Sequence, residues 1–214
     1  MNVKTILKNA LFSIIVLSVN NSYSQDSLSV KQDKKDDGIK TIFGKTKSHG
    51  GYLGLSCDYT QLNNNDGIMM GGQLGWIINH SFVIGVAGYG FMSDYVDYSV
   101  DNYPQISGGY GGLYFESIVF PKFPVHVSFP VLLGVGGATS YSSFTNDDWS
   151  YYADDSDAFL VAEPGVNIEL NMLKFFKIAF GAKYRFTSEL YMPNIDKEAL
   201  NGLSAGITLK FGKF

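Results

Sequence analysis

Eight stretches of this 214-residue sequence alternate apolar residues with polar or small ones at a period of two, which is the pattern of β-strands. No stretch shows a helical period of comparable quality. Aromatic residues make up 15% of the chain and glycine contributes 24 residues, whereas only 17% of residues are charged, and this balance favours strands. The alternating stretches are residues 51–61, 67–78, 81–92, 106–120, 125–139, 158–170, 175–187 and 203–211.

The connections between these stretches are alternately short and long. In an up-and-down barrel, successive connections emerge at opposite ends, so one end carries tight turns and the other carries long loops. Each stretch also has about the 9–11 residues that a tilted transmembrane strand needs. We therefore expect an all-β fold, an eight-stranded antiparallel up-and-down barrel. The short connections are residues 79–80, 121–124 and 171–174, the long ones are 93–105, 140–157 and 188–202, and the first, 62–66, is intermediate.

The distribution of charge indicates which face of the barrel is apolar. Residues 67–93 and 125–139 contain no Asp, Glu, Lys or Arg on either face. In a soluble barrel the outer face of the strands is hydrated and normally carries charged side chains, whereas a membrane barrel needs one apolar face in contact with lipid. We therefore expect the apolar face, for example Phe176, Ile178 and Phe180, to lie in lipid.

The opposite face carries all the charges of the predicted strands, four acidic and four basic. Side chains fill the lumen of an eight-stranded barrel, and a buried charge without a partner is prohibitively costly. The sequence therefore predicts a closed lumen with a charge-paired network, although a merely solvated charged face is the alternative. The predicted network consists of Asp58, Glu116, Glu163, Glu169, Lys177, Lys183, Arg185 and Lys210.

A specific pairing follows for the hairpin around residues 171–174. Directly opposed residues of an antiparallel pair have a constant sum of residue numbers. Glu169 with Lys177 and Glu163 with Lys183 both give 346, so both pairs fit one register. We expect them to lie opposite each other, with Arg185 reaching Glu163 diagonally or an acid on another strand.

The first residues have the order of a secretory signal peptide. Lys4 and Lys8 precede a short apolar run and then small polar residues, so we expect a signal peptide at 1–24, a flexible periplasmic tail at 25–48 and a barrel at 49–214. Removal of two lysines from the 16 basic residues leaves 14 against 20 acids, a net charge of −6. This balance argues against nucleic acid as a partner.

The long connections are acidic and aromatic, and Lys197 is their only basic residue. Such a surface either is simply hydrated or binds a divalent cation, a sugar or a basic partner. The segment DDWSYYADDSD lacks the glycine and the spaced acids of an EF-hand loop, and no cofactor is expected. The candidate loop surface comprises Asp147, Asp148, Trp149, Tyr151, Tyr152, Asp154, Asp155 and Asp157.

His126 and Ser128 are the one pair that suggests a base and a nucleophile. They share the lumen face of one stretch near the predicted periplasmic end, and no acid that could orient the histidine is evident in the sequence. We therefore expect no catalytic residues. Cys57 is the only cysteine, so no internal disulfide can form, and its parity places it on the lipid face.

The segments EPGVNIELNMLKFFKIAFGAKYRF and GLSAGITLKFGKF resemble the C-terminal half of the small eight-stranded outer-membrane β-barrels of the OmpA/OmpX kind, found in Gram-negative bacteria. The resemblance covers residues 50–214 and implies location in the outer membrane. It also implies outer-membrane lipid and the barrel insertion machinery, through the C-terminal strand, as partners. Phe214 departs from the usual pattern because its parity is polar, so either Gly212 introduces a bulge or Phe211 ends the strand.

These features favour a structural or surface-interaction barrel with a closed lumen. The alternatives are a small channel or transport porin, a membrane-embedded lipid-modifying enzyme, and a soluble periplasmic barrel.

Overall fold

The computed structural model describes residues 49–62, 65–93, 105–142, 152–193 and 195–214. The described residues belong to one compact unit. The predicted segments 1–24 and 25–48 lie outside the described residues. No helix among the described residues is long and apolar enough to cross a membrane. The unit is built from strands β1 (His49–Leu62), β2 (Asn65–Ile78), β3 (Phe82–Ser93), β4 (Gln105–Val119), β5 (Val125–Ser142), β6 (Tyr152–Leu173), β7 (Phe176–Thr187) and β8 (Gly202–Lys213).

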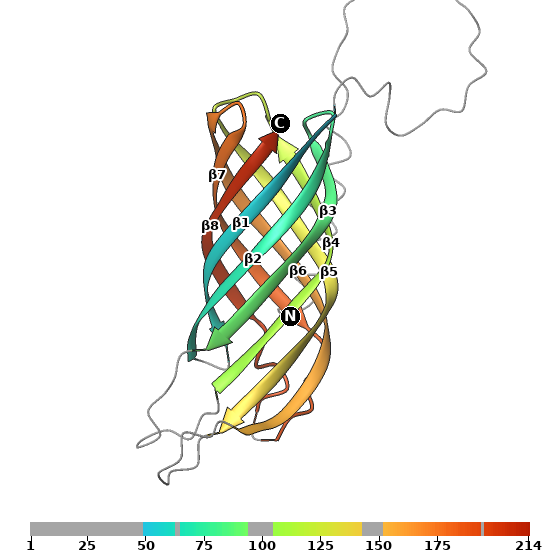
Figure 1. Cartoon of the computed structure of the whole chain (residues 1–214), viewed down its shortest axis with the longest axis vertical. Coiled ribbons are helices and arrows are strands. Elements are labelled where there is room, and N and C mark those ends of the chain that lie inside the picture. The colour runs from blue at the N-terminus through green and yellow to red at the C-terminus, as the bar shows by residue number, and fades with distance from the viewer. Residues whose placement is uncertain (1–48, 63–64, 94–104, 143–151, 194) are drawn as a thin grey trace, which may run out of the picture. The chain divides into compact units, whose positions relative to one another are not determined.

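The strands form a closed barrel in sequence order, and every neighbouring pair is antiparallel (Figure 1). The first and last strands close it, with Gly51 opposite Lys213. The predicted all-β, eight-stranded up-and-down fold is therefore confirmed. The start of β1 and the end of β8 lie at the same end, together with the turns after β2, β4 and β6, and we call this the turn end. The opposite end is called the loop end.

The turn after β2 shows how tightly the chain reverses at the turn end. Ser81 donates its N–H to the Ile78 carbonyl at 3.2 Å, and Asn79 and His80 between them have positive φ angles of 53° and 59°. Two positive φ angles are the signature of a type I′ turn, whose twist matches that of the flanking strands. Asn tolerates this conformation better than most residues.

The hairpin of β5 and β6 is longer than the alternation predicted. Its ladder continues through Thr139 opposite Ser156 and Ser140 opposite Asp155, then beyond an irregularity after Ser140. The expected loop 140–157 is therefore wrong at both of its ends. The physical reason is that backbone hydrogen bonds hold a ladder together whatever its side chains are. The side chains of this extension are mostly polar, so the sequence shows no apolar alternation there.

Two glycines show how little room the barrel interior leaves. A Cβ atom added to Gly71 would lie 2.2 Å from a ring carbon of Tyr89, and one added to Gly181 would lie 2.0 Å from the Asn167 side-chain oxygen. Glycine at these positions lets large side chains of the neighbouring strands cross the lumen.

The strand charges lie inside the barrel together with buried aromatic and aliphatic residues, and the outer face of the strands is apolar. On β1, Tyr52 and Asp58 are buried while Leu53, Leu55 and Tyr59 are exposed, and the other strands alternate in the same way. Cys57 is exposed on the outward face, where its parity had placed it. This arrangement differs from that of a soluble barrel, which keeps its charged side chains on the outside.

Candidate functional site

The charged side chains predicted for the lumen all lie inside the barrel. They come from five strands, and between 0% and 8% of each residue's surface is exposed. They form two clusters and one separate cation. The turn-end cluster is defined by Glu116, Glu169, Lys210, Lys177, His126, Ser128 and Tyr52, the middle cluster by Asp58, Glu163, Lys183 and Tyr110, and the separate cation is Arg185.

Lys210 is the centre of the turn-end cluster. Its Nζ lies 2.6 Å from Glu116 Oε1 and 2.5 Å from Glu169 Oε1. The Ser128 hydroxyl lies 2.6 Å from Glu116 Oε1 and 2.9 Å from Glu169 Oε1, so it lies within hydrogen-bonding reach of both carboxylates. Four strands, β4, β5, β6 and β8, are thereby joined inside the barrel.

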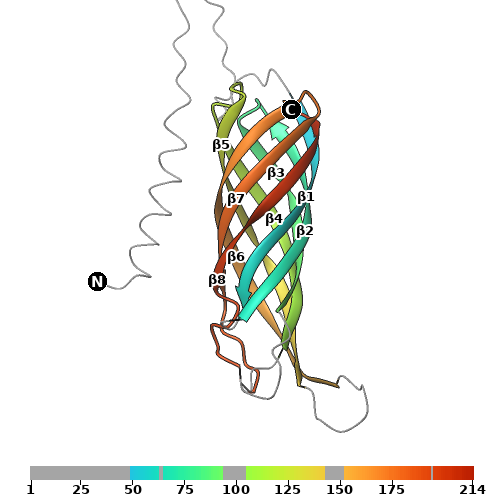
Figure 2. The ribbon, with the colours of Figure 1, turned by 90° about the vertical axis from the view of Figure 1, so that its left-hand side faces the viewer.

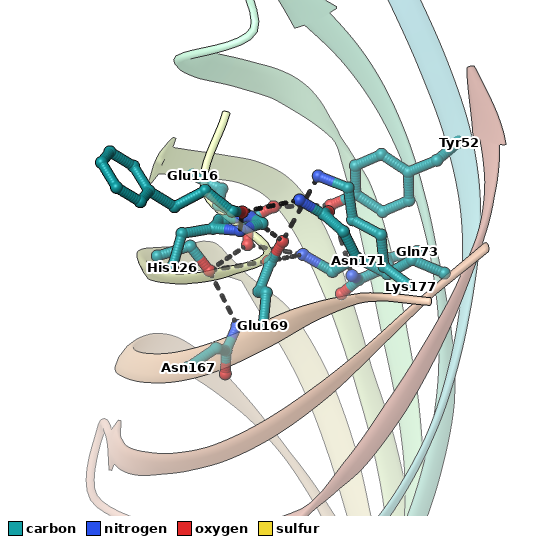
Figure 3. A network of polar contacts seen from close by, with 11 residues as sticks. Tyr52, Gln73, Glu116, His126, Asn167, Glu169, Asn171 and Lys177 are labelled. Atoms are coloured by element: carbon teal, nitrogen blue, oxygen red, sulfur yellow. Dashed lines mark hydrogen bonds and ion pairs between the residues drawn. The ribbon is translucent and has the colours of Figure 1, made fainter. Parts of the chain in front are cut away.

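The remaining carboxylate oxygens of this cluster are also occupied (Figure 3). His126 Nε2 lies 3.0 Å from Glu169 Oε2, and Lys177 Nζ lies 3.8 Å from the same oxygen. The Tyr52 hydroxyl donates to Glu116 Oε2 at 2.7 Å. Each buried carboxylate thus has several partners, which is the condition under which buried charge is tolerated.

The middle cluster pairs one lysine with two acids. Lys183 Nζ lies 2.9 Å from Asp58 Oδ2 and 3.7 Å from Glu163 Oε1. Tyr110 donates its hydroxyl to Glu163 Oε2, and Lys183 Nζ also lies 4.1 Å from the centre of the Tyr89 ring. The second acid is therefore stabilised by a tyrosine hydroxyl as well as by the shared lysine.

The predicted register of the β6–β7 hairpin is wrong by two residues. Lys177 lies opposite Asn171, and Lys183 lies opposite Gly165. The strands are joined at residues 174–175 rather than through the expected connection 171–174, so that Leu173 lies opposite Phe176, and an irregularity between Asn171 and Leu173 then shifts the pairing by one residue. Because side chains alternate with a period of two, a shift of two keeps every residue on its face. The contacts of Lys177 with Glu169 and of Lys183 with Glu163 are therefore diagonal.

Arg185 does not make the ion pair expected for it. Within the described parts of the chain, no carboxylate oxygen lies within 4.0 Å of its guanidinium. Its Nε instead donates to the Leu200 carbonyl at 2.6 Å, and its guanidinium carbon lies 5.4 Å from the Phe91 ring centre. The Glu163 carboxylate accepts a hydrogen bond from the Tyr110 hydroxyl instead, and the Leu200 carbonyl of the segment before β8 lies within reach of the Arg185 guanidinium.

That segment, residues 188–201, was expected to be a hydrated loop. Figure 2 shows it folded at the loop end of the barrel. Its polar residues are exposed, but its apolar ones join the same buried cluster as Phe91, Ile106 and Phe159. The signal that could have revealed this is the number of aliphatic residues in the segment, which is higher than in either of the other two long connections. The buried apolar residues are Leu190, Met192, Ile195, Ala199 and Leu200.

The C-terminal residue lies over the lumen at the other end. The Phe214 ring stacks on Tyr52 with 5.8 Å between ring centres, and Lys177 Nζ lies 4.3 Å from the centre of the Phe214 ring. The pairing of β8 with both neighbours continues without a shift, so the alternative of a bulge at Gly212 is wrong. Phe211 is thus the last outward-facing apolar residue of the strand.

The lumen between the two clusters is nearly full. The enclosed space there is about 10 Å³ and is lined by residues that include Gln73, Tyr114 and Asn167. This volume is about that of one water-sized probe. The space between the clusters at this level therefore has room for about one water molecule.

The candidate loop surface lies largely beyond what the structure describes. Asp147, Asp148, Trp149 and Tyr151 fall outside the described residues, and the side chains of Tyr152 and Asp154 are likewise not described. Asp157 accepts a hydrogen bond from the Tyr191 N–H at 2.7 Å, and the Asp155 carboxylate accepts one from the Ser156 N–H. Among the described residues, no group of three or more His, Cys, Asp or Glu side chains has the geometry to hold a metal ion.

The loop end also contains an exposed ion pair. Lys197 Nζ lies 3.1 Å from Glu189 Oε2, and both side chains are more than half exposed. The hydrogen bond to Glu189 raises the pKa of Lys197, so this pair is charged throughout the neutral range.

His126 and Ser128 do lie near each other, and Glu169 is the acid that the sequence did not reveal. The Ser128 hydroxyl, however, contacts the two carboxylates, while His126 contacts Glu169 and the Phe123 carbonyl. Both residues are buried beneath the turn end. The Ser128 hydroxyl thus has the two carboxylates rather than His126 as its partners, and both residues lie inside the barrel wall.

Comparisons with known proteins support the fold. No family model matches the sequence, and a search of curated proteins finds no match. The chain is similar in structure to Neisserial surface protein A, with 11% identity, a TM-score of 0.54 and coverage of 78% of this chain and 97% of that one. The N-terminal β-barrel domain of Pseudomonas aeruginosa OprF (10% identity, TM-score 0.45, coverage 75% and 96%) and Yersinia pestis Ail (11%, 0.41, 77% and 97%) also match. The chain therefore has the eight-stranded fold of outer-membrane β-barrels.

Proposed function

We propose that the protein is an integral outer-membrane β-barrel whose lumen is closed by paired charges, and that it has a structural or surface-interaction role. In the proposed orientation the turn end faces the periplasm and the loop end faces outward. The observation that carries this proposal is the inverted barrel, in which buried charges lie inside while large apolar side chains are exposed around the outside.

The exposed apolar surface supports membrane insertion. Leu74, Trp76 and Val135 expose 57%, 59% and 62% of their surface, and exposed apolar residues of comparable size occur on all eight strands. Soluble monomers rarely expose a contiguous apolar patch of more than a few hundred Å². Insertion into lipid removes the unfavourable contact of this apolar surface with water. A closed barrel also leaves no unpaired strand edge in the bilayer.

The filled lumen supports a closed barrel over a channel. Lys210, Lys183 and Arg185 extend into the interior from two adjacent strands and contact groups on other strands or on the segment before β8. An ion could pass through the lumen only if these side chains left their partners. Each buried charge separated in this way would cost roughly several kcal/mol.

The charge at the loop end supports a surface role. The described charged residues there outside the lumen are the acids Asp66, Asp155, Asp157, Glu189, Asp196 and Glu198, with Lys197 as the one cation among them. Such a surface favours a cationic or hydrogen-bond-donating partner over an acidic one.

Reconstitution of the purified chain tests the proposal. The protein should float with lipid vesicles, and planar bilayers that contain it should show no discrete channels. Stable single-channel currents would contradict the closed lumen, and recovery of folded protein free of the vesicles would contradict membrane insertion.

A further inference from the structure

A groove of about 390 Å³ lies on the outward face of β1, β2 and β3 near the turn end. Its base is backbone, because four of its lining residues are glycines, Gly50, Gly51, Gly75 and Gly85. Its sides are apolar and are between 41% and 59% exposed. These side residues are Leu74, Trp76, Ile84 and Val86.

The groove exists because outward-facing Gly51 has no side chain beside Trp76, its partner in the β1–β2 register. A Cβ atom added to Gly51 would meet no atom closer than the Gly75 carbonyl oxygen at 3.4 Å. The space is therefore open rather than a tight backbone contact. At Gly85, in contrast, an added Cβ would lie 1.9 Å from the Leu74 carbonyl oxygen, so β2 and β3 approach closely beneath the groove.

One end of the groove is polar. Lys213 pairs with Gly51 across β8 and β1 and is exposed, and Trp76 Nε1 donates to His49 Nδ1 at 3.3 Å. Outside the lumen, the described charged residues at the turn end are Lys122, Lys174 and Lys213, with no Asp or Glu among them. Tryptophan and lysine side chains favour the boundary between hydrocarbon and headgroups. The other end of the groove, at Leu74 and Val86, points toward the middle of the barrel wall.

We propose that this groove binds one phospholipid of the leaflet at the turn end. One acyl chain lies along Leu74, Ile84 and Val86, and the phosphate of the same lipid meets the Lys213 ammonium. The inference rests on the proposed membrane location. The volume is at the low end of the roughly 300–1,000 Å³ of small-molecule sites, which suits a single chain rather than a whole lipid.

Two matched substitutions separate this groove from the rest of the lipid-facing surface. Gly51→Leu fills the groove, whereas Gly72→Leu adds the same side chain on the outward face of β2 outside it. A Cβ atom is tolerated at both positions, with nearest contacts at 3.4 Å for Gly51 and 3.5 Å for Gly72. Gly51→Ala provides a smaller change should the leucine variant fail to fold.

The measurement is native mass spectrometry of the full chain released from vesicles of phosphatidylglycerol and phosphatidylcholine, after flotation to establish insertion. We expect one retained phospholipid, with the lipid-bound fraction reduced about fivefold or more by Gly51→Leu, less by Gly51→Ala, and unchanged by Gly72→Leu. Lys213→Gln should reduce the preference for the anionic lipid by about fivefold, the value of one basic side chain near a membrane surface. Lys174→Gln should leave it unchanged.

Equal lipid retention by the Gly51 and Gly72 variants would overturn the site while leaving the membrane barrel intact. A lipid-free dimer that Gly51→Leu dissociates would overturn it as well, because the groove would then be a contact between two copies. Failure of the unaltered chain to float with vesicles would overturn the proposed function and the site together.

Discussion

The Lys210 ammonium on β8 lies 2.5 Å from the Glu169 carboxylate on β6, although β7 separates these two strands in the sheet. The contact therefore passes over β7 inside the barrel. The same ammonium lies 2.6 Å from Glu116 on β4, the strand opposite β8 in the closed barrel, so the cation also links two opposite walls. The free energy of unfolding that is lost when Lys210 is replaced therefore measures how much the lumen network stabilises the barrel.

Lys210→Met should destabilise the barrel strongly. The substitution removes a buried cation and leaves Glu116 and Glu169 with the more distant Lys177, His126 and hydroxyl donors. Breaking a buried pair in this way costs about 3–5 kcal/mol. Urea unfolding from lipid vesicles measures the loss. Lys122→Met, an exposed lysine at the turn end, is the control and should change stability by less than about 0.5 kcal/mol. Equal effects of the two changes would refute a paired lumen.

The middle cluster makes a separate prediction. Asp58→Asn and Lys183→Met should each destabilise the fold, but the double variant should be less destabilised than the sum of the two, since Lys183 Nζ lies 2.9 Å from Asp58 Oδ2. A double-mutant cycle should give a coupling free energy of about 0.5–3 kcal/mol. Additive effects would mean that the two charges do not interact. The cycle should also be independent of Lys210→Met, because the clusters share no partner.

Much of this arrangement follows from the sequence, because a period of two fixes the face of every strand residue. The eight strands and the grouping of the charges on one face follow from that parity, and the two charge-free stretches 67–93 and 125–139 indicate which face is outward. Pairing partners do not, because the turn lies at residues 174–175 rather than 171–174, and the resulting difference of two residues from the expected register changes no face. The partner of Arg185 was equally hidden, since Leu200 contributes a backbone carbonyl and any residue there would offer the same group.

The burial of residues 188–201 could not be read from alternation, because the segment has no strand or helix period. Its apolar residues are spaced irregularly, and only the closed barrel creates the mouth in which they are buried. The sequence also does not predict that β6 extends through Asp155 and Asp157, although here the structure is regular. Those residues form a regular ladder with β5, yet they carry the polar side chains of a loop.

Arg185→Met should loosen this segment. The variant keeps an unbranched side chain as far as the position of Nε but loses the guanidinium and with it the hydrogen bond from Nε to the Leu200 carbonyl. A hydrogen bond from a charged group contributes about 1.5–3 kcal/mol, so the open form should become about tenfold or more populated. Trypsin cleavage after exposed Lys197, followed in detergent micelles, should accelerate accordingly. Cleavage after Lys122 in the β4–β5 turn should keep its rate, and acceleration at both sites would indicate general unfolding instead.

The native cysteine allows the most direct test of the inverted barrel. Cys57 is exposed on the outward face of β1, between Leu55 and Tyr59 and next to the buried Asp58. A spin label on Cys57 in vesicles should collide often with oxygen, which concentrates in hydrocarbon, and rarely with a water-soluble nickel chelate. Lys122→Cys in a Cys57→Ser background supplies the reference for a site in water. High oxygen and low nickel accessibility at Cys57 is the predicted result, whereas nickel accessibility equal to that of the Lys122→Cys reference would contradict the placement of the apolar face in lipid.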